Sequence, residues 1–330
     1  MRAYKQKISF FLLIFSFVFS GCGMDADEKL AEVILKAQMQ MSEGLCSEAL
    51  TTLSGYSSDT NARFIITKAS AYACLGGLRS GAEFISTDIP NTATPSPFGG
   101  TAKYTTSDDM TSTTESKYLS MQSAVDLLIY AGGLSEASNP TVALRRAAFS
   151  TKDSLDIHSQ LMYFMLIQLG RYYHFYGNSS STGVKGSGTG AYSNSCFINY
   201  DNIASDGTPD INSILSLGGG ACTASTDQGH DDIGTTGSLD HSIMCQGVIL
   251  MNHLFAVIPE VLSGFAGDDL TAISSFSTLL TTLKSVMVTY RASTSTVNGV
   301  LSQSLCESQN SASQDDIQFY FASLIEPMFQ

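Results

Sequence analysis

The sequence predicts an all-α protein. Apolar residues recur at spacings of three and four over long stretches, which is the pattern of helices that bury one face. Segments rich in Gly, Ser and Thr separate these stretches and indicate loops. No set of alternating apolar and polar residues stands out that would indicate the strands of a sheet. The stretches with a helical period are 27–53, 114–131, 141–176, 239–262, 269–290 and 313–326.

Composition narrows the possible functions. The 330 residues are 43% hydrophobic, which suffices for a core of one large or two modest domains. The chain has 17 basic and 30 acidic residues, so its net charge is −13. Affinity for nucleic acid depends on neutralising phosphates with Lys and Arg. The composition therefore argues against nucleic acid as a partner.

The N-terminus carries an export signal. Arg2, Lys5 and Lys7 precede an apolar run from Ile8 to Phe19, which is too short to span a bilayer permanently. The run ends in the sequence Phe-Ser-Gly-Cys at positions 19–22, which resembles the lipobox of bacterial lipoproteins. This resemblance implies a signal peptide over 1–21, cleavage before Cys22, and acyl chains on Cys22 that hold the protein to the membrane through a tether at 22–26. Gly23 in place of Asp implies, by the same resemblance, delivery to the outer membrane of the cell envelope.

Six further cysteines belong to the exported part of the chain. In an oxidising compartment they are expected to form disulfides, and many connectivities are open to six thiols. Pairing of sequence neighbours gives Cys46–Cys74, Cys196–Cys222 and Cys245–Cys306. The alternative for one of them is metal ligation by His241 and Cys245, four residues apart on an expected helix.

Residues 27–53 read as a helix, a turn at Gly44 and a second helix. The turn returns 33 residues later, where Gly77 and Ala82 repeat the spacing of Gly44 and Ala49. Self-similarity at this period indicates stacked helical hairpins. The glycine–alanine spacing resembles tetratricopeptide (TPR) repeats, and this resemblance implies two TPR-like hairpins over 27–86, whose grooves bind peptides. Contact between neighbouring hairpins would also bring Cys46 near Cys74.

Residues 87–112 are rich in Thr, Ser, Pro and Gly and are expected to form an inserted loop. The rest of the chain, 113–330, reads as a divergent helical region. Its first helix, 114–131, stops at Gly132 and Gly133. The next stretch, 141–176, is one long helix or two helices broken near Ser150, and it ends in an aromatic cluster at 172–176.

A long polar loop follows at 177–238, with one short helix around 209–217. The stretch 239–262 predicts a buried helix that bends at Pro259. Residues 269–290 show the clearest amphipathic pattern, and a last helix is expected over 313–326.

Three short motifs contain residue types that occur in catalytic, metal-binding or phosphate-binding sites. The cluster Asp227–Asp232 contains carboxylates beside His230, and it is the one candidate in the sequence for the acid–base site of an enzyme. The run Asp206–Asp210 shares two positions with calcium loops but lacks the bidentate Glu. Gly186–Gly190 has the composition of a phosphate loop without its Lys. These motifs fall short of a site, so we assign no catalytic residue, metal ligand or cofactor.

The sequence therefore predicts a non-enzymatic, lipid-anchored helical scaffold that binds another envelope protein or a peptide. The alternative is a periplasmic or surface solute-binding lipoprotein that holds a small ligand among its helices.

The lipobox interpretation is tested at the nucleophile. We expect Cys22→Ser to abolish incorporation of radiolabelled palmitate and to move the protein from the membrane to the soluble fraction, because a hydroxyl does not form the thioether. Cys46→Ser is the control and should retain the label. Acylation of the Cys22→Ser variant would contradict the lipoprotein assignment.

Overall fold

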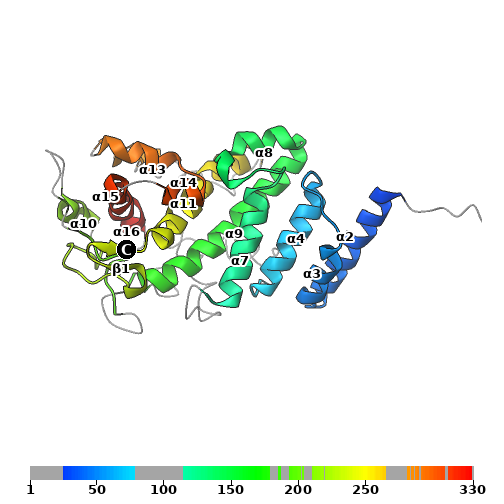
Figure 1. Ribbon diagram of the computed structural model, residues 1–330, viewed down its shortest axis with the longest axis horizontal. Coiled ribbons are helices and arrows are strands. Elements are labelled where there is room, and N and C mark those ends of the chain that lie inside the picture. The colour runs from blue at the N-terminus through cyan, green and yellow to red at the C-terminus, as the bar shows by residue number, and fades with distance from the viewer. Residues whose placement is uncertain are drawn as a thin grey trace, which may run out of the picture.

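The computed structural model shows an elongated protein whose chain runs from one end to the other (Figure 1). It describes residues 25–78, 114–178, 185–186, 193–201, 203, 210–218, 220–264, 281–282, 284–285, 287–289, 291–308 and 311–328. Over these residues helices dominate, and a single two-residue hairpin is the sheet, so the predicted all-α class is confirmed.

The first half of the described chain contains six helices. They are α2 (Ala26–Ser42), α3 (Cys46–Ser54), α4 (Ala62–Leu75), α7 (Ser116–Ile129), α8 (Val142–Ala148) and α9 (Thr151–Gly177), with a 3₁₀ turn at Glu136–Ser138.

The second half is more broken. Its helices are α10 (Ile211–Gly218), α11 (His241–Gly264), α13 (Ser295–Gly299), α14 (Gln303–Glu307), α15 (Ser311–Tyr320) and α16 (Glu326–Met328). A π-helical turn, Phe321–Ile325, joins the last two, and 3₁₀ turns lie at Asp231–Ile233 and Ala292–Thr294. The strands β1 (Gly234–Thr235) and β2 (Ser238–Leu239) pair antiparallel, with Gly234 opposite Leu239.

Five helices stand side by side in chain order. Helix α3 folds back on α2, α4 packs against both, α7 packs on α4, and α9 packs on α7 (Figure 1). Helix α11 lies on α9, and the C-terminal helices gather at the far end. A small core lies between α2, α3 and α4, whereas the large core extends from α4 through α9 to the C-terminal helices.

The turn that repeats in the sequence has the same backbone geometry at both of its positions. Gly44 and Gly77 adopt φ of +78° and +89°, the left-handed conformation that favours glycine. After each glycine the next amide closes the helix end: Leu45 N donates to Gln40 O at 2.8 Å, and Leu78 N donates to Ala73 O at 3.0 Å. These are two copies of the Schellman motif, 33 residues apart.

Most helix predictions are confirmed. The predicted 114–131 corresponds to α7, and Gly132 follows it with φ of +87°. Of the two possibilities for 141–176 the structure has the broken one, because the Ser150 side chain accepts from Asp153 N and so begins α9. Helix α11 continues through Pro259.

Other expected segments fall partly or wholly outside the described residues. The loop at 87–112 lies outside them, and of the expected helix at 269–290 the described positions, 281–282, 284–285 and 287–289, are helical.

The described parts of the expected loop at 177–238 are mostly irregular outside the short helix, but one stretch of them is apolar and buried. Cys196, Phe197, Ile198 and Tyr200 are at most 1% exposed and belong to the large core. The apolar run is only a few residues long and is flanked by Ser and Asn, so composition averaged over the segment hides it. The short helix expected around 209–217 is α10.

Among the described helices, α11 alone is long and apolar enough to cross a membrane. However, 67% of its most apolar window is buried inside the protein, largely against α9. The helix therefore serves as a core helix, as the sequence predicts.

The turn geometry gives a test with a matched control. A Cβ at Gly44 or at Gly55 would meet no atom within 4 Å, but only Gly44 has a positive φ. We expect Gly44→Ala to lower the free energy of unfolding by about 1 kcal/mol, and Gly55→Ala to leave it unchanged or raise it slightly. Chemical denaturation measures both. Equal effects would mean that the left-handed turn does not limit stability.

Candidate functional site

The six cysteines form three disulfides. Cys46–Cys74, Cys196–Cys222 and Cys245–Cys306 have Cα–Cα distances of 5.6, 4.8 and 5.8 Å, and they are the pairs expected from the sequence. The first joins the start of α3 to the end of α4. The last bonds the sulfur of Cys245, so the alternative of a metal held by His241 and Cys245 is wrong.

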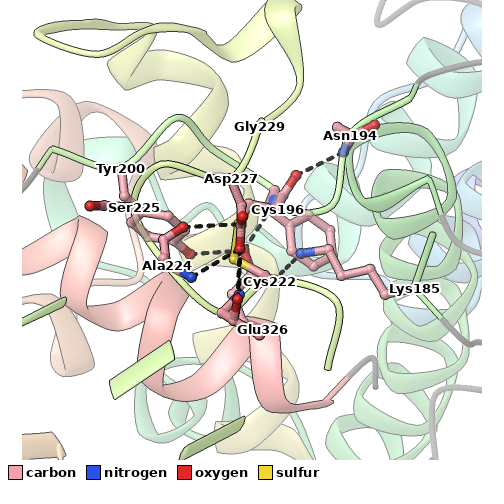
Figure 2. Close-up of a disulfide and its surroundings, with 12 residues drawn as sticks. Lys185, Asn194, Cys196, Tyr200, Cys222, Ala224, Ser225, Asp227, Gly229 and Glu326 are labelled. Atoms are coloured by element: carbon pink, nitrogen blue, oxygen red, sulfur yellow. Dashed lines mark hydrogen bonds and ion pairs between the residues drawn. A yellow bond between two sulfur atoms is a disulfide. The ribbon is translucent and has the colours of Figure 1, made fainter. Parts of the chain in front are cut away.

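A second arrangement of metal-ligating atoms is also occupied. Cys196, Cys222 and Glu326 bring one ligand atom each to within 4.8 Å of one another (Figure 2). Both sulfurs are consumed by the disulfide. Glu326 Oε1 accepts from Phe197 N at 2.8 Å and from the Tyr200 hydroxyl at 3.0 Å, and Oε2 pairs with Lys185. The cluster is a structural network of a disulfide, hydrogen bonds and an ion pair rather than a metal site.

Lys185 belongs to this network, and the side chains of both Lys185 and its partner Glu326 are buried. Its ammonium group sits 4.4 Å from the centroid of the Phe197 ring. Burial lowers the pKa of Lys185 to about 8, and the Glu326 carboxylate opposes that shift. The pair joins Lys185 to α16, and the hydrogen bonds that Glu326 accepts from Phe197 N and the Tyr200 hydroxyl join α16 to the 193–201 segment.

The residues of the predicted acidic cluster 227–232 differ in burial and in their contacts. Asp227 Oδ2 accepts from Thr223 N at 2.7 Å and Ala224 N at 2.9 Å; burial favours a higher pKa, but these bonds leave it below its usual value. His230 is buried against Phe175, 4.7 Å between ring centroids. Asp231 and Asp232 are exposed. His230 Nδ1 accepts from Asp232 N at 3.2 Å, so this part of the cluster shapes a turn.

The other two short motifs are only partly described. Asp210 Oδ1 accepts from Ser213 N at 2.8 Å and begins α10, while 204–209 lie outside the described residues. Of the glycine-rich run 186–190, Gly186 alone is described. The aromatic residues at 172–176 are buried in the large core.

A cleft with a volume of about 520 Å³ lies between α4 and α7. This lies within the range of ordinary ligand pockets, about 300–1,000 Å³. We call it the α4/α7 cleft. Its lining residues are Ser57, Ser58, Asp59, Phe64, Ile65, Lys68, Tyr72, Ser123, Asp126, Leu127, Tyr130, Ala131, Gly133 and Leu134.

Helical spacing produces the two walls. On α4 the residues Phe64, Lys68 and Tyr72 follow one another at i, i+4 and i+8. On α7 and its C-cap, Ser123, Asp126, Leu127 and Tyr130 follow at i, i+3, i+4 and i+7. Residues at such spacings share one face of a helix. Two neighbouring helices thus present facing stripes of aromatic, aliphatic and charged side chains.

Hydrogen bonds hold the rim in place. The Asn61 side chain accepts from Phe64 N at 2.9 Å and begins α4. Gly132 N donates to Asp59 O at 2.9 Å, which joins the rim of one wall to the end of the other. The Tyr130 hydroxyl donates to Glu136, and Glu136 Oε2 accepts from Ser302 Oγ at 2.6 Å. The cleft is therefore a preformed surface.

Asp126 is the unusual group of the cleft. Its Oδ1 accepts from Gln122 Nε2 at 2.8 Å, and no basic side chain of the described residues forms an ion pair with it. Burial, and to a smaller extent the charge of Glu136, raises the pKa of Asp126 to about 6, although the Gln122 hydrogen bond opposes the shift. Gln122 Oε1 in turn accepts from Gln168 Nε2 on α9 at 3.1 Å.

A smaller hollow of about 360 Å³ lies beside α11. Lys284 lines it, donates to Asn252 Oδ1 at 3.0 Å, and sits 4.5 Å from the Phe255 ring centroid. Burial lowers the pKa of Lys284 to about 8.

Comparison of the chain with protein-family models, with curated proteins and with solved structures finds no match. The class is therefore defined by the fold and the cleft: an all-α protein with a row of side-by-side helices and an interhelical cleft between α4 and α7.

Sequence reasoning did not find the α4/α7 cleft. The helical stripes on 64–72 and 123–130 are present in the sequence, but each reads equally well as a face turned to the core. What the sequence lacks is the pairing of α4 with α7 across the intervening segment.

The electrostatics of Asp126 give a stability test. A raised carboxyl pKa means that the ionised form is disfavoured in the folded state, so the penalty is present above pH 6 and vanishes below about pH 4. We expect Asp126→Asn to raise the free energy of unfolding by about 1 to 2 kcal/mol at pH 7.5, because the amide keeps the bond from Gln122 and carries no charge. The gain should shrink as the pH falls from 6 to 4.

Glu32→Gln, on the exposed face of α2, is the control and should change stability by less than about 0.5 kcal/mol at either pH. Loss of stability in Asp126→Asn at pH 7.5 would show that the ionised carboxylate stabilises the free protein.

Proposed function

We propose that this protein is a lipoprotein of the bacterial cell envelope, held in the outer membrane by acyl chains on Cys22, and that it acts as a non-enzymatic scaffold that binds an envelope protein or peptide in the α4/α7 cleft.

The observation that carries the proposal is the preformed cleft itself. Aromatic and aliphatic side chains line it beside two acidic groups and one basic group, and this mixture is typical of surfaces that bind protein segments. Helices on both sides and hydrogen bonds at the rim fix its shape before a partner arrives, which lowers the entropic cost of binding.

The repeated turns support a relation to TPR-like hairpins. Gly44 and Gly77 end α2 and α4 with the same backbone geometry, and the helices from α2 to α9 stand in a row. We infer that the row is a divergent array of stacked hairpins. In such arrays each hairpin contacts its neighbours and leaves a groove between helices.

The proposed location is consistent with the disulfides. Three of them in one chain suit the oxidising side of the cytoplasmic membrane. The lipobox resemblance at 19–22 supplies the route to that side and the anchor.

The solute-binding lipoprotein stays the second candidate because the two hollows, of about 520 and 360 Å³, suit small ligands. A metabolite retained through purification would favour it.

Site-specific photocrosslinking in intact cells tests the scaffold. A benzophenone side chain in place of Tyr72 on α4 or Ser123 on α7 should form adducts with one and the same envelope protein, because both positions line the cleft. Mass spectrometry identifies the adduct.

The control position is Lys152 on α9, whose side chain is 83% exposed and does not line the cleft. Absence of any adduct at 72 and 123 beyond those formed at 152 would overturn the scaffold proposal.

A further inference from the structure

We propose that the α4/α7 cleft reads a basic residue of its partner: a Lys or Arg side chain, in an extended apolar segment, places its charged group on the Asp126 carboxylate and its aliphatic stem along Tyr72 and Tyr130. The inference rests on the proposed function, because it names the chemistry of the partner that the cleft accepts.

The first argument is a carboxylate with one oxygen unpaired by the described residues. Asp126 lines the cleft and is only partly exposed, and its Oδ1 takes the Gln122 hydrogen bond. Oδ2 accepts no hydrogen bond from the described residues. A partly buried carboxylate normally has a cationic partner, since burial penalises an uncompensated charge. Here a donor that enters from the cleft would complete the site.

The second argument is the charge of the lining. The lining contains two acidic residues, Asp59 and Asp126, and one basic residue, Lys68. The ammonium group of Lys68 lies over the Phe64 ring, 5.9 Å from its centroid. Glu136 adds a further negative charge through its contact with Tyr130. The balance of the cleft is acidic, like that of the whole chain, so a cationic group is favoured over an anionic one.

The third argument is the shape and character of the walls. Tyr72, Leu127, Tyr130 and Leu134 are half-buried and line the cleft on both sides of Asp126. Lys and Arg place a long aliphatic stem on apolar surface while the charged head meets polar groups, and ring faces attract the cation. The remaining volume accommodates the apolar neighbours of the basic residue in an extended segment.

The titration of Asp126 predicts a pH dependence of binding. The charged groups around it are Asp59 from the turn before α4, Lys68 on α4, and Glu136. With a pKa of about 6, Asp126 is ionised at pH 7.5 and mostly protonated at pH 5, so affinity for a cation should fall about tenfold over that interval.

Selection from a random dodecapeptide library, displayed on phage and applied to the full acylated protein in detergent, tests the proposal. Wild-type protein and the Glu32→Gln control should enrich peptides with Lys or Arg between apolar residues. Asp126→Asn should lose that enrichment, although it keeps the fold and the bond from Gln122. Fluorescence polarisation then compares the best peptide with its norleucine analogue, and we expect the neutral analogue to bind at least about tenfold more weakly.

Selected peptides without basic residues, equal selection by Asp126→Asn, or equal binding of the norleucine analogue would each overturn the inference. Binding of phenethylamine with no binding of any peptide would also overturn it, in favour of a small organic cation. If crosslinking identifies an envelope partner while Asp126→Asn selects the same peptides, the scaffold proposal stands and this inference fails. If basic peptides are selected but no envelope adduct forms, the cleft chemistry stands and the envelope role fails.

Discussion

Helix α9 is the constraint on which the rest of the structure depends. It is 27 residues long, and from Leu161 onward nearly every side chain is buried. Helices α4 and α7 pack on one side of it and α11 packs on another. A surface helix needs one apolar face, but a helix covered on several sides must be apolar around its circumference. The aromatic residues at 172–176 satisfy this demand and carry the core into the C-terminal region.

Buried charges connect the irregular segments to that core. Arg145 is fully buried and donates to the carbonyls of Ile129 and Pro140 at 3.1 and 2.9 Å and to His158 Nε2 at 3.2 Å. Burial lowers the pKa of Arg145 to about 10. Like Glu326, this side chain bonds backbone and side-chain groups of segments remote in the sequence or outside the helices. A chain with only 14% charged residues thus places several of its charged side chains in the interior.

The α4/α7 cleft differs from these interior charges because its carboxylate lines a surface hollow. Its carboxylate keeps a free oxygen and a raised pKa, so the free protein bears a cost that a cation would remove. Groups of this kind concentrate at binding sites because stability and function place opposite demands on them. The network from Asp126 through Gln122 to Gln168 on α9 connects the cleft to the central helix, so the site belongs to the rigid part of the molecule.

The sequence by itself determined the all-α class and the turns at Gly44 and Gly77, and it offered a break near Ser150 as one of two possibilities. It also indicated the three cysteine pairs. The helices and turns depend on local periodicity, on capping side chains and on φ angles that favour glycine, all of which are encoded within a few residues.

Only the tertiary structure decided which faces meet. The burial of 196–200 depends on contacts with residues more than a hundred positions away, including Glu326. The cleft exists because α4 packs on α7, which no local pattern specifies. The acidic cluster at 227–232 was likewise divided by tertiary packing, because His230 is buried against Phe175 while Asp231 and Asp232 are exposed.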